Sequence, residues 1–210
     1  MSQAFSGAVM FFVNGGFFMI LLVALSVSAG TVILLRVLAL RERLIVPPEL
    51  EAALEDVQPG DSMESLARAA QAHPSPLGRI ITTCLAHRNW PRLENLEAVQ
   101  VRARHEVVRM ESGLSLLEMT TGVAPLFGLL GTLSGLVTIF ANLGGGAAGG
   151  DTVAVARGIA EALNTTIVGL AVAAPSLIAH NYFQRKVETM AVTMEALISD
   201  LLAKCYPDAR

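Results

Sequence analysis

The chain has 210 residues, of which 53% are hydrophobic and only 16% are charged, and its mean hydropathy is +0.55. Soluble domains carry about 25% charged residues, so this composition departs in the direction of a membrane protein. The formal net charge of -3 excludes a strongly basic chain, and no basic surface interleaved with aromatic residues is found, so no nucleic-acid partner is expected.

Three stretches that are nearly free of charge predict three membrane-spanning helices. No Asp, Glu, Lys or Arg precedes Arg36, none falls within 119–150, and a third gap separates Glu161 from Arg185. A helix needs about 20 apolar residues to cross about 30 Å of hydrocarbon, and each gap is long enough. The sequence therefore predicts transmembrane helices at 16–40, 113–142 and 153–180.

The first predicted span is expected to be an uncleaved anchor that follows a short segment, 1–15. A signal peptide would need a basic region before a short apolar core, whereas no basic residue precedes this run and the run continues past Leu35. After it, segment 41–112 is predicted to be a helical domain, because short helical patterns alternate there with prolines. Segment 181–210 is predicted to be a C-terminal helix.

One long, unbroken helix is predicted to start in segment 41–112 and to enter the bilayer as the second span. Apolar residues recur along it at spacings of three and four, and a similar stripe follows the third span. Packing within one subunit and packing between subunits in a ring both explain these stripes, and the two explanations are compatible. The stripes consist of Leu93, Leu96, Val99, Ala103, Val107, Met110, Leu114 and Leu117, and of Val187, Met190, Met194, Leu197 and Leu201.

The distribution of Lys and Arg predicts the orientation of the chain. The basic residues that follow the first and third spans are Arg36, Arg41, Arg43, Arg185 and Lys186. Loops on the cytoplasmic side carry an excess of such residues. We therefore expect a periplasmic N-terminus, a cytoplasmic C-terminus, a cytoplasmic domain at 41–112 and a periplasmic Gly-rich loop at 143–152.

Small residues predict that the second and third spans pack tightly against each other. In lipid, helices associate by close approach of their backbones, and glycine permits that approach. The short connection between the two spans also makes them antiparallel neighbours. The residues with this expected packing role are Gly128, Gly131 and Gly135 in the second span and Gly158, Ala162 and Gly169 in the third.

Polar side chains within these two spans are the candidates for a functional site. Thr132, Thr165 and Thr166 can each return a hydrogen bond to the backbone, which is the structural explanation for any one of them. Glu161 is harder to explain, because an acidic residue costs roughly 2.5–3.5 kcal/mol at the centre of a span and less near its end. Arg157 stands four residues earlier, but such exposed pairs contribute only about 0.3–0.5 kcal/mol.

The polar residues of the third span do not all point in one direction. On an ideal helix Glu161 and Thr165 share a face, while Thr166 lies roughly 140° around the axis from Glu161. One straight helix therefore cannot aim all three at one point. Either the helix bends, for which Pro175 is a candidate, or the residues serve two interfaces.

Two stretches of these spans carry a resemblance to a known family: "APLFGLLGTLSGLVTIF" and "GIAEALNTTIVGLAVAAP", the latter followed by "NYF". They resemble the ExbB/TolQ branch of the MotA/TolQ/ExbB proton-channel family, in matching order and spacing over 122–183. The resemblance implies an all-α membrane protein of the bacterial inner membrane, with three transmembrane helices and long cytoplasmic helical extensions. It also implies a homopentameric ring around two copies of an ExbD/TolR-like single-span protein.

The same resemblance implies a function. It makes the chain a proton-conducting motor subunit that converts proton motive force into mechanical work, with the acid that carries the proton on the partner. Thr132, Glu161 and Thr166 fall on the positions of the family's polar lining, and Thr165 replaces a small residue and would widen the polar track. The resemblance does not tell which process is powered, whether nutrient import, envelope maintenance or surface motility.

Two other functions compete with this one. A non-conducting scaffold that anchors an envelope-spanning complex would tolerate apolar residues at Thr132, Glu161 and Thr166. An intramembrane enzyme is not expected, because the histidines show no metal-ligand spacing and no serine has an evident base. No cofactor and no metal site are expected, and Cys84 and Cys205 are expected to be structural. The histidines are His73, His87, His105 and His180.

Overall fold

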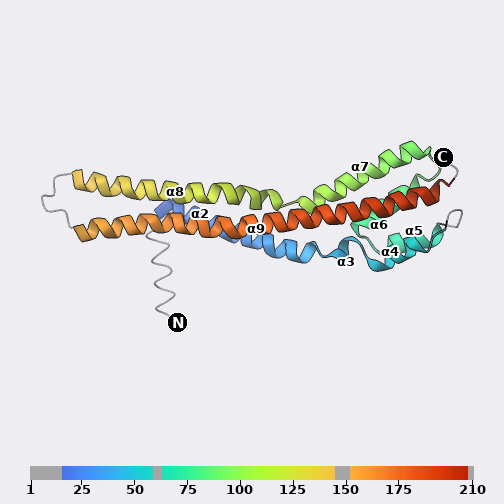
Figure 1. Ribbon diagram of the computed structural model, residues 1–210, viewed down its shortest axis with the longest axis horizontal. Coiled ribbons are helices and arrows are strands. Elements are labelled where there is room, and N and C mark those ends of the chain that lie inside the picture. The colour runs from blue at the N-terminus through green and yellow to red at the C-terminus, as the bar shows by residue number, and fades with distance from the viewer. Residues whose placement is uncertain (1–15, 59–62, 145–151, 208–210) are drawn as a thin grey trace, which may run out of the picture. The chain divides into compact units, whose positions relative to one another are not determined.

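The structure is a computed structural model that describes residues 16–58, 63–144 and 152–207. These ranges are helical and contain no strand, which confirms the predicted all-α class. The segment predicted at 1–15 and most of the Gly-rich loop predicted at 143–152 lie outside the described residues. The helices, labelled as in Figure 1, are α2 (Gly16–Ala39), α3 (Glu42–Ile45), α4 (Pro48–Glu55), α5 (Glu64–Ala72), α6 (Pro76–Ala86), α7 (Arg92–Glu111), α8 (Leu114–Gly144) and α9 (Thr152–Cys205).

Three of these helices, α2, α8 and α9, are long and apolar enough to cross a membrane, which confirms the prediction of three spans. The third of them is much longer than a bilayer is thick. The 54 residues of α9 extend about 81 Å at 1.5 Å per residue, whereas the hydrocarbon core measures about 30 Å. Only part of α9 can therefore lie in lipid, and the remainder continues beyond it as one helix.

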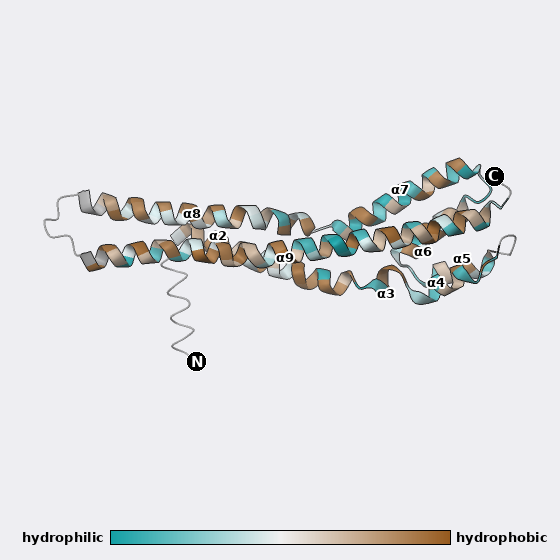
Figure 2. Cartoon of the chain, in the orientation of Figure 1, coloured by the Kyte–Doolittle hydropathy of each residue, from teal (hydrophilic) through white to brown (hydrophobic). Residues whose placement is uncertain are grey.

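The chain divides into two compact units. The membrane unit comprises 16–34 and 113–181, and the polar unit comprises 35–112 and 182–207. The hydropathy colouring in Figure 2 shows the contrast, with the polar residues concentrated in the second unit. Between Gly113 and Asn181 the sequence of the membrane unit contains only four charged residues, which are Glu118, Asp151, Arg157 and Glu161.

The buried core of the membrane unit is small. Leu22 of α2, Ala124 of α8 and Ala173 of α9 form one cluster, and Phe127 packs on it. The ring of Phe18 in α2 adds to this contact, with its centroid 6.4 Å from that of Phe127. Most of the other large apolar side chains of these helices are exposed in the single chain. Such surfaces are expected on helices that face lipid or further protein.

The prediction of one unbroken helix from segment 41–112 into the second span is wrong, because α7 and α8 are separate helices. Ser112 leaves the helical conformation with a ψ of 135°, and Gly113 adopts a φ of +80°. A residue with a Cβ pays about 1–2 kcal/mol in that region, so glycine suits the break. Arg36 donates to Met110 O at 3.3 Å and to the Ser112 hydroxyl, which satisfies a carbonyl at the end of α7. The apolar spacing continues across the break, so periodicity did not reveal it.

In the polar unit, α4 to α7 pack beside one another and the end of α9 is attached to them. Lys204 of α9 donates a hydrogen bond to Leu54 O at 2.9 Å, at the C-terminal end of α4. Tyr206 follows α9; its hydroxyl accepts from Asn95 Nδ2 at 3.0 Å and donates to Trp90 O at 3.0 Å. These bonds connect the end of α9 and Tyr206 to the end of α4, to the turn between α6 and α7 and to the first turn of α7.

A buried ion pair joins α6 to α7. The side chain of Glu106 is fully buried and receives a hydrogen bond from Arg79 Nε at 2.9 Å, while Arg102 Nη2 lies 3.1 Å from it. Burial alone would raise the pKa of Glu106, but the hydrogen bond from Arg79 and the surrounding guanidinium charges outweigh burial and hold the pKa below its usual range. The carboxylate therefore stays ionised and fastens the two helices together.

The two cysteines, which are distant in sequence, are neighbours in the polar unit. Both are free thiols, and Cys84 in α6 is buried. A hydrogen bond with Cys205 at the end of α9 and burial together raise the pKa of the Cys84 thiol. Cys84 is therefore a protonated, packed side chain, as expected of a structural cysteine.

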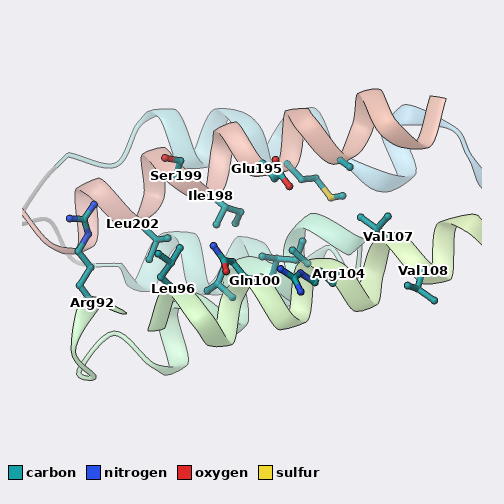
Figure 3. A pocket seen from close by; sticks show the side chains of 15 residues that line it. Arg92, Leu96, Gln100, Arg104, Val107, Val108, Glu195, Ile198, Ser199 and Leu202 are labelled. Atoms are coloured by element: carbon teal, nitrogen blue, oxygen red, sulfur yellow. The ribbon is translucent and has the colours of Figure 1, made fainter. Parts of the chain in front are cut away.

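Parts of the two apolar stripes line a groove of about 790 Å³ between α7 and the second half of α9 (Figure 3). In Figure 3, Leu96 of α7 projects toward Ile198 and Leu202 of α9. Packing within one subunit is thus found for the buried part of each stripe, while packing between subunits stays a prediction. The stripe residues buried in the polar unit are Val99 and Met110 in α7, and Val187, Met190, Met194 and Leu201 in α9.

Candidate functional site

The predicted small residues lie where α8 and α9 approach most closely. A Cβ placed on Gly128 would lie 3.0 Å from a Cα atom of α9, and a Cβ on Gly169 would lie 2.6 Å from Ala124 O. A Cβ on Gly135 would lie 2.8 Å from the Cβ of Ala162. These separations are shorter than ordinary carbon contacts, so the approach of the two helices depends on the absence of side chains here.

Thr132 of α8 and Thr166 of α9 meet across this interface. Their hydroxyl oxygens lie 2.5 Å apart. Thr132 Oγ1 also lies 3.0 Å from Ala162 O and 3.2 Å from Gly128 O, and Thr166 Oγ1 lies 3.1 Å from the same Gly128 O. Thr132 is 7% exposed and Thr166 is half-buried, so the pair is a largely enclosed polar contact between two of the spans.

The two hydroxyls have only two hydrogens to share among these contacts, because each hydroxyl donates once. If Thr132 donates to Thr166, then Thr166 donates to Gly128 O. If Thr166 donates to Thr132, then Thr132 donates to the carbonyl of Ala162 or Gly128. Both arrangements satisfy both hydroxyls, so the pair can reverse its direction without leaving a buried donor unpaired.

Thr165 also faces α8, but the contact is made by its methyl group. Thr165 is 2% exposed, and a Cβ on Gly131 would overlap its Cγ2 atom. The face of α9 that touches α8 is centred on Ala162 and Gly169, so Thr165 and Thr166 flank its midline on opposite sides. One helix can therefore bring both threonines to α8, although they are about 100° apart around its axis.

Glu161 lies at the edge of this face, about 100° around α9 from Ala162. Its Oε1 atom is 3.2 Å from Arg157 Nε, and the two side chains are 43% and 77% exposed. This ion pair is the structural explanation for a carboxylate at this position of the span. Arginine precedes glutamate in it, which is the less favourable order on a helix, and exposed pairs contribute only about 0.3–0.5 kcal/mol. Within the described residues, Glu161 forms no hydrogen bond with Thr132 or Thr166.

Two further buried hydroxyls of the membrane unit went unnoticed in the sequence, Thr120 in α8 and Ser176 in α9. Each donates to a carbonyl one turn earlier, Thr120 to Leu116 O at 2.7 Å and Ser176 to Val172 O at 2.8 Å. These are the ordinary bonds of a hydroxyl in a transmembrane helix. Thr120 and Ser176 therefore differ from the Thr132–Thr166 pair, which forms bonds from one helix to the other.

The acceptor carbonyls of the threonine pair were also missed, although a signal for them exists. Gly128 precedes Thr132 by four residues, and Ala162 precedes Thr166 by four. A small residue one turn before a threonine uncovers the carbonyl at that turn. The coincidence of this pattern in two adjacent spans would have indicated carbonyls open to a neighbouring helix.

Comparisons with known proteins cover both units. Residues 61–196 match the MotA/TolQ/ExbB proton channel family. The chain is 36% identical over 170 residues to the biopolymer transport protein ExbB-like 1 of Synechocystis sp., which covers 77% of this chain and 65% of that protein. It is 32% identical over 182 residues to the biopolymer transport protein ExbB homolog of Methanothermobacter thermautotrophicus, covering 84% and 63%.

A third relative is the biopolymer transport protein ExbB of Neisseria gonorrhoeae, 28% identical over 155 residues, with 67% of this chain and 70% of that protein covered. The chain thus spans slightly less than two thirds of the length of the first two relatives. The matched family region, 61–196, includes α8 and the part of α9 that holds the threonines and Glu161.

Proposed function

Because the chain belongs to the MotA/TolQ/ExbB proton channel family, in its ExbB branch, we propose that it is the proton-conducting subunit of an ion-driven membrane complex for biopolymer transport. In this proposal the complex converts proton motive force into mechanical work, together with two copies of an ExbD/TolR-like single-span protein. Five copies of the chain form a ring in the inner membrane. The N-terminus is periplasmic, and the polar unit is cytoplasmic.

The observation that carries the proposal is the hydroxyl pair of Thr132 and Thr166. It bridges two spans, lies at the α8–α9 contact, and can reverse the direction in which its hydroxyls donate. A proton carrier on a neighbouring helix alternates between an acid that donates and a base that accepts. A reversible hydroxyl pair can serve both forms without a buried group being left unpaired.

Glu161 has a different part in the proposal. Its weak pair with Arg157 leaves 43% of the side chain exposed in the single chain, so a neighbouring subunit or partner helix can reach it. In a ring this position would face the enclosed interior, because a carboxylate toward acyl chains is costly. Each proton that crosses carries about 2.3 kcal/mol per 100 mV of membrane potential. Glu161 would gather protons at one end of that path.

Assembly from several copies is supported by apolar surface on the polar unit. Leu93, Val101 and Val108 recur at intervals of eight and seven residues on α7, and each is at least 64% exposed. They lie on the side of α7 opposite its buried residues, such as Val99. Large exposed apolar patches on polar surfaces mark sites of association.

The test is proton flux through the complex in liposomes, with the chain and its single-span partner co-purified. Thr132→Val, Thr166→Val and Glu161→Gln are each expected to abolish potential-driven flux while the mass of the assembled ring stays unchanged. The matched control is Thr138→Val in α8, because the hydroxyl of Thr138 is exposed and donates to Ser134 O at 3.0 Å within its own helix. Normal flux in all three site variants would refute the proposal.

The non-conducting scaffold remains the second candidate, and one observation favours it. Both hydroxyls of the Thr132–Thr166 pair find all their hydrogen-bond partners inside the chain. The pair can therefore serve only to hold α8 and α9 together. A scaffold predicts no potential-driven flux in the unaltered complex. It also predicts that the threonine variants change stability alone.

A further inference from the structure

A second pocket, of about 380 Å³, lies between α3 and α9 in the polar unit, and the proposed proton path makes no use of it. Its volume falls within the range of about 300–1,000 Å³ that is usual for ligand sites. On α9 the lining residues follow one another at intervals of three, one, three, one and three, and they are Tyr182, Arg185, Lys186, Thr189, Met190 and Thr193. Such spacing places them on one continuous face of the helix.

This face combines positive charge with hydroxyls and an aromatic ring. Lys186 Nζ lies 5.9 Å from the centre of the Tyr182 ring. Within the part of the chain that the structure describes, neither Arg185 nor Lys186 forms an ion pair. Glu42 of α3 also lines the pocket, so two cations face one carboxylate and the lining is net positive. The cations are therefore available to an anion from outside the chain.

The hydroxyls of the pocket can be redirected toward such an anion. Thr189 donates to Arg185 O at 2.9 Å, and Thr193 donates to Thr189 O at 3.1 Å. Both carbonyls lie inside α9, where backbone N–H groups already bond to them. If either hydroxyl donates to a phosphate oxygen instead, the helix carbonyl keeps its backbone hydrogen bond. The hydroxyl then forms a stronger, charge-assisted bond.

The position of these residues along α9 selects the kind of anion. Arg185 is the first charged residue after Glu161, and the uncharged run between them is long enough to cross the hydrocarbon. Arg185 and Lys186 follow the end of that run within about one helical turn, roughly 5 Å. The headgroup layer of a bilayer is about 5–7 Å thick on each side. On α9, these cations therefore come at the level of the lipid phosphates.

We propose that this pocket binds the phosphate of an anionic membrane phospholipid. Arg185 and Lys186 contact the phosphate oxygens, and the hydroxyl of Thr189 donates to one of them. Tyr182, which is 59% exposed, and the apolar side chain of Val46 lie beside the glycerol end of the lipid. The site would hold the end of the third span at a set depth, and it requires neither the proton path nor the single-span partner.

The simpler explanation is that Arg185 and Lys186 only set the orientation of the chain, as basic residues after a span generally do. That explanation predicts attraction to any negative surface in proportion to net charge, with no role for the hydroxyl. A second source of the same chemistry is free phosphate in solution. The experiment is designed to separate a built lipid site from both.

The experiment measures lipids that stay bound to the purified full-length chain, by native mass spectrometry during titration with dioleoyl-phosphatidylglycerol or with dioleoyl-phosphatidylcholine. Two cations near the surface predict a preference of about 30-fold for the anionic lipid. Arg185→Gln combined with Lys186→Gln is expected to reduce this preference to about that of an uncharged site, and Thr189→Val to reduce it only in part. The charge-matched control combines Arg68→Gln with Arg88→Gln, both exposed and outside the pocket.

Loss of the preference in the pocket variant, with retention in the control, supports the lipid site. An equal loss in both variants would show that net charge alone attracts the lipid, which overturns the proposal. Displacement of bound lipid by millimolar inorganic phosphate or glycerol phosphate would assign the pocket to a soluble anion and would also overturn it. Absence of any preference in the unaltered chain has the same consequence. None of these readouts depends on proton flux, so the result stands apart from the proposed function.

Discussion

In the membrane unit the buried polar groups are hydroxyls, whereas in the polar unit they include an ionised carboxylate. Thr132 and Thr166 are held by each other and by backbone carbonyls. Glu106 has a fully buried side chain, but its partners Arg79 and Arg102 keep 32% and 34% of their side chains exposed. The guanidinium groups thus remain partly hydrated while they neutralise the buried charge.

The difference follows from the solvent around each unit. Water beside the polar unit hydrates the outer part of each arginine, so a buried charge can be retained at moderate cost. Lipid offers no such hydration, and it supplies no hydrophobic drive to bring helices together. The membrane unit therefore relies on close backbone approach and uncharged hydrogen bonds, and Glu161 at the edge of the α8–α9 interface stays half-exposed.

The largest effect is expected from Glu106→Gln in the polar unit. Removal of one partner from a buried ion pair costs about 3–5 kcal/mol, and we expect the lower end because both arginines reach solvent. The measurement is the unfolding free energy of the full chain in mild detergent. Glu97→Gln, at an exposed position of the same helix, is the control. Equal effects of the two substitutions would show that the buried ion pair contributes no more to the unfolding free energy than an exposed carboxylate does.

In the membrane unit the strongest effect is expected from Gly169→Ala. The new Cβ would lie 2.6 Å from Ala124 O, and overpacking of this kind costs about 1–3 kcal/mol. Gly122→Ala is the matched control, because a Cβ at that position of α8 would meet no atom within 4 Å beyond the adjoining backbone of its own helix. The control should be neutral or slightly stabilising, since alanine is the better helix former. Thermal unfolding in detergent compares the two, and an unchanged midpoint for Gly169→Ala would contradict the close approach.

Acid should weaken the polar unit through Glu106. The folded protein holds the pKa of this carboxyl below its unfolded value, so between the two values the unfolded chain binds more protons. The stabilisation is complete above about pH 5 and is lost as the pH falls toward the folded pKa, by at most about 1.4 kcal/mol per pH unit. The difference in stability between the unaltered chain and Glu106→Gln should therefore shrink as the pH falls below about 5. A difference that stays constant to pH 3 would show that the carboxylate's charge is not what stabilises the unit.

The smallest effect on the unfolding free energy is expected from the threonine pair, because its hydrogen bond is uncharged, unlike the ion pair of Glu106. A double-mutant cycle of Thr132→Val and Thr166→Val should give a coupling energy of about 0.6 kcal/mol, and at most about 1.7 kcal/mol, as found for hydrogen bonds between transmembrane helices. Unfolding in detergent measures this coupling. A zero coupling would mean that the two hydroxyls do not bond to each other in the folded protein.

Sequence reasoning was most successful where the physical cause is local. Absence of charge over 20 or more residues marks a span whatever the span packs against, which is why the helices that hold the threonines and Glu161 could be assigned. The break at Ser112 and Gly113 was missed because apolar spacing is the same on both sides of it. The burial of Glu106 was missed because its partner Arg79 lies 27 residues away, on another helix.

The sequence by itself determined the class of protein, the number of its spans, its family and the polar residues within the membrane, because hydropathy and motif spacing are properties of a single helix. Only the tertiary structure decided which of those residues meet. Thr132 pairs with Thr166 and not with Thr165 because α8 crosses α9 at glycines whose missing side chains set the rotation of each helix. The same rotation leaves Glu161 at the edge of the α8–α9 interface, with no described hydrogen bond to Thr132 or Thr166, whereas its pair with Arg157 forms within α9 itself.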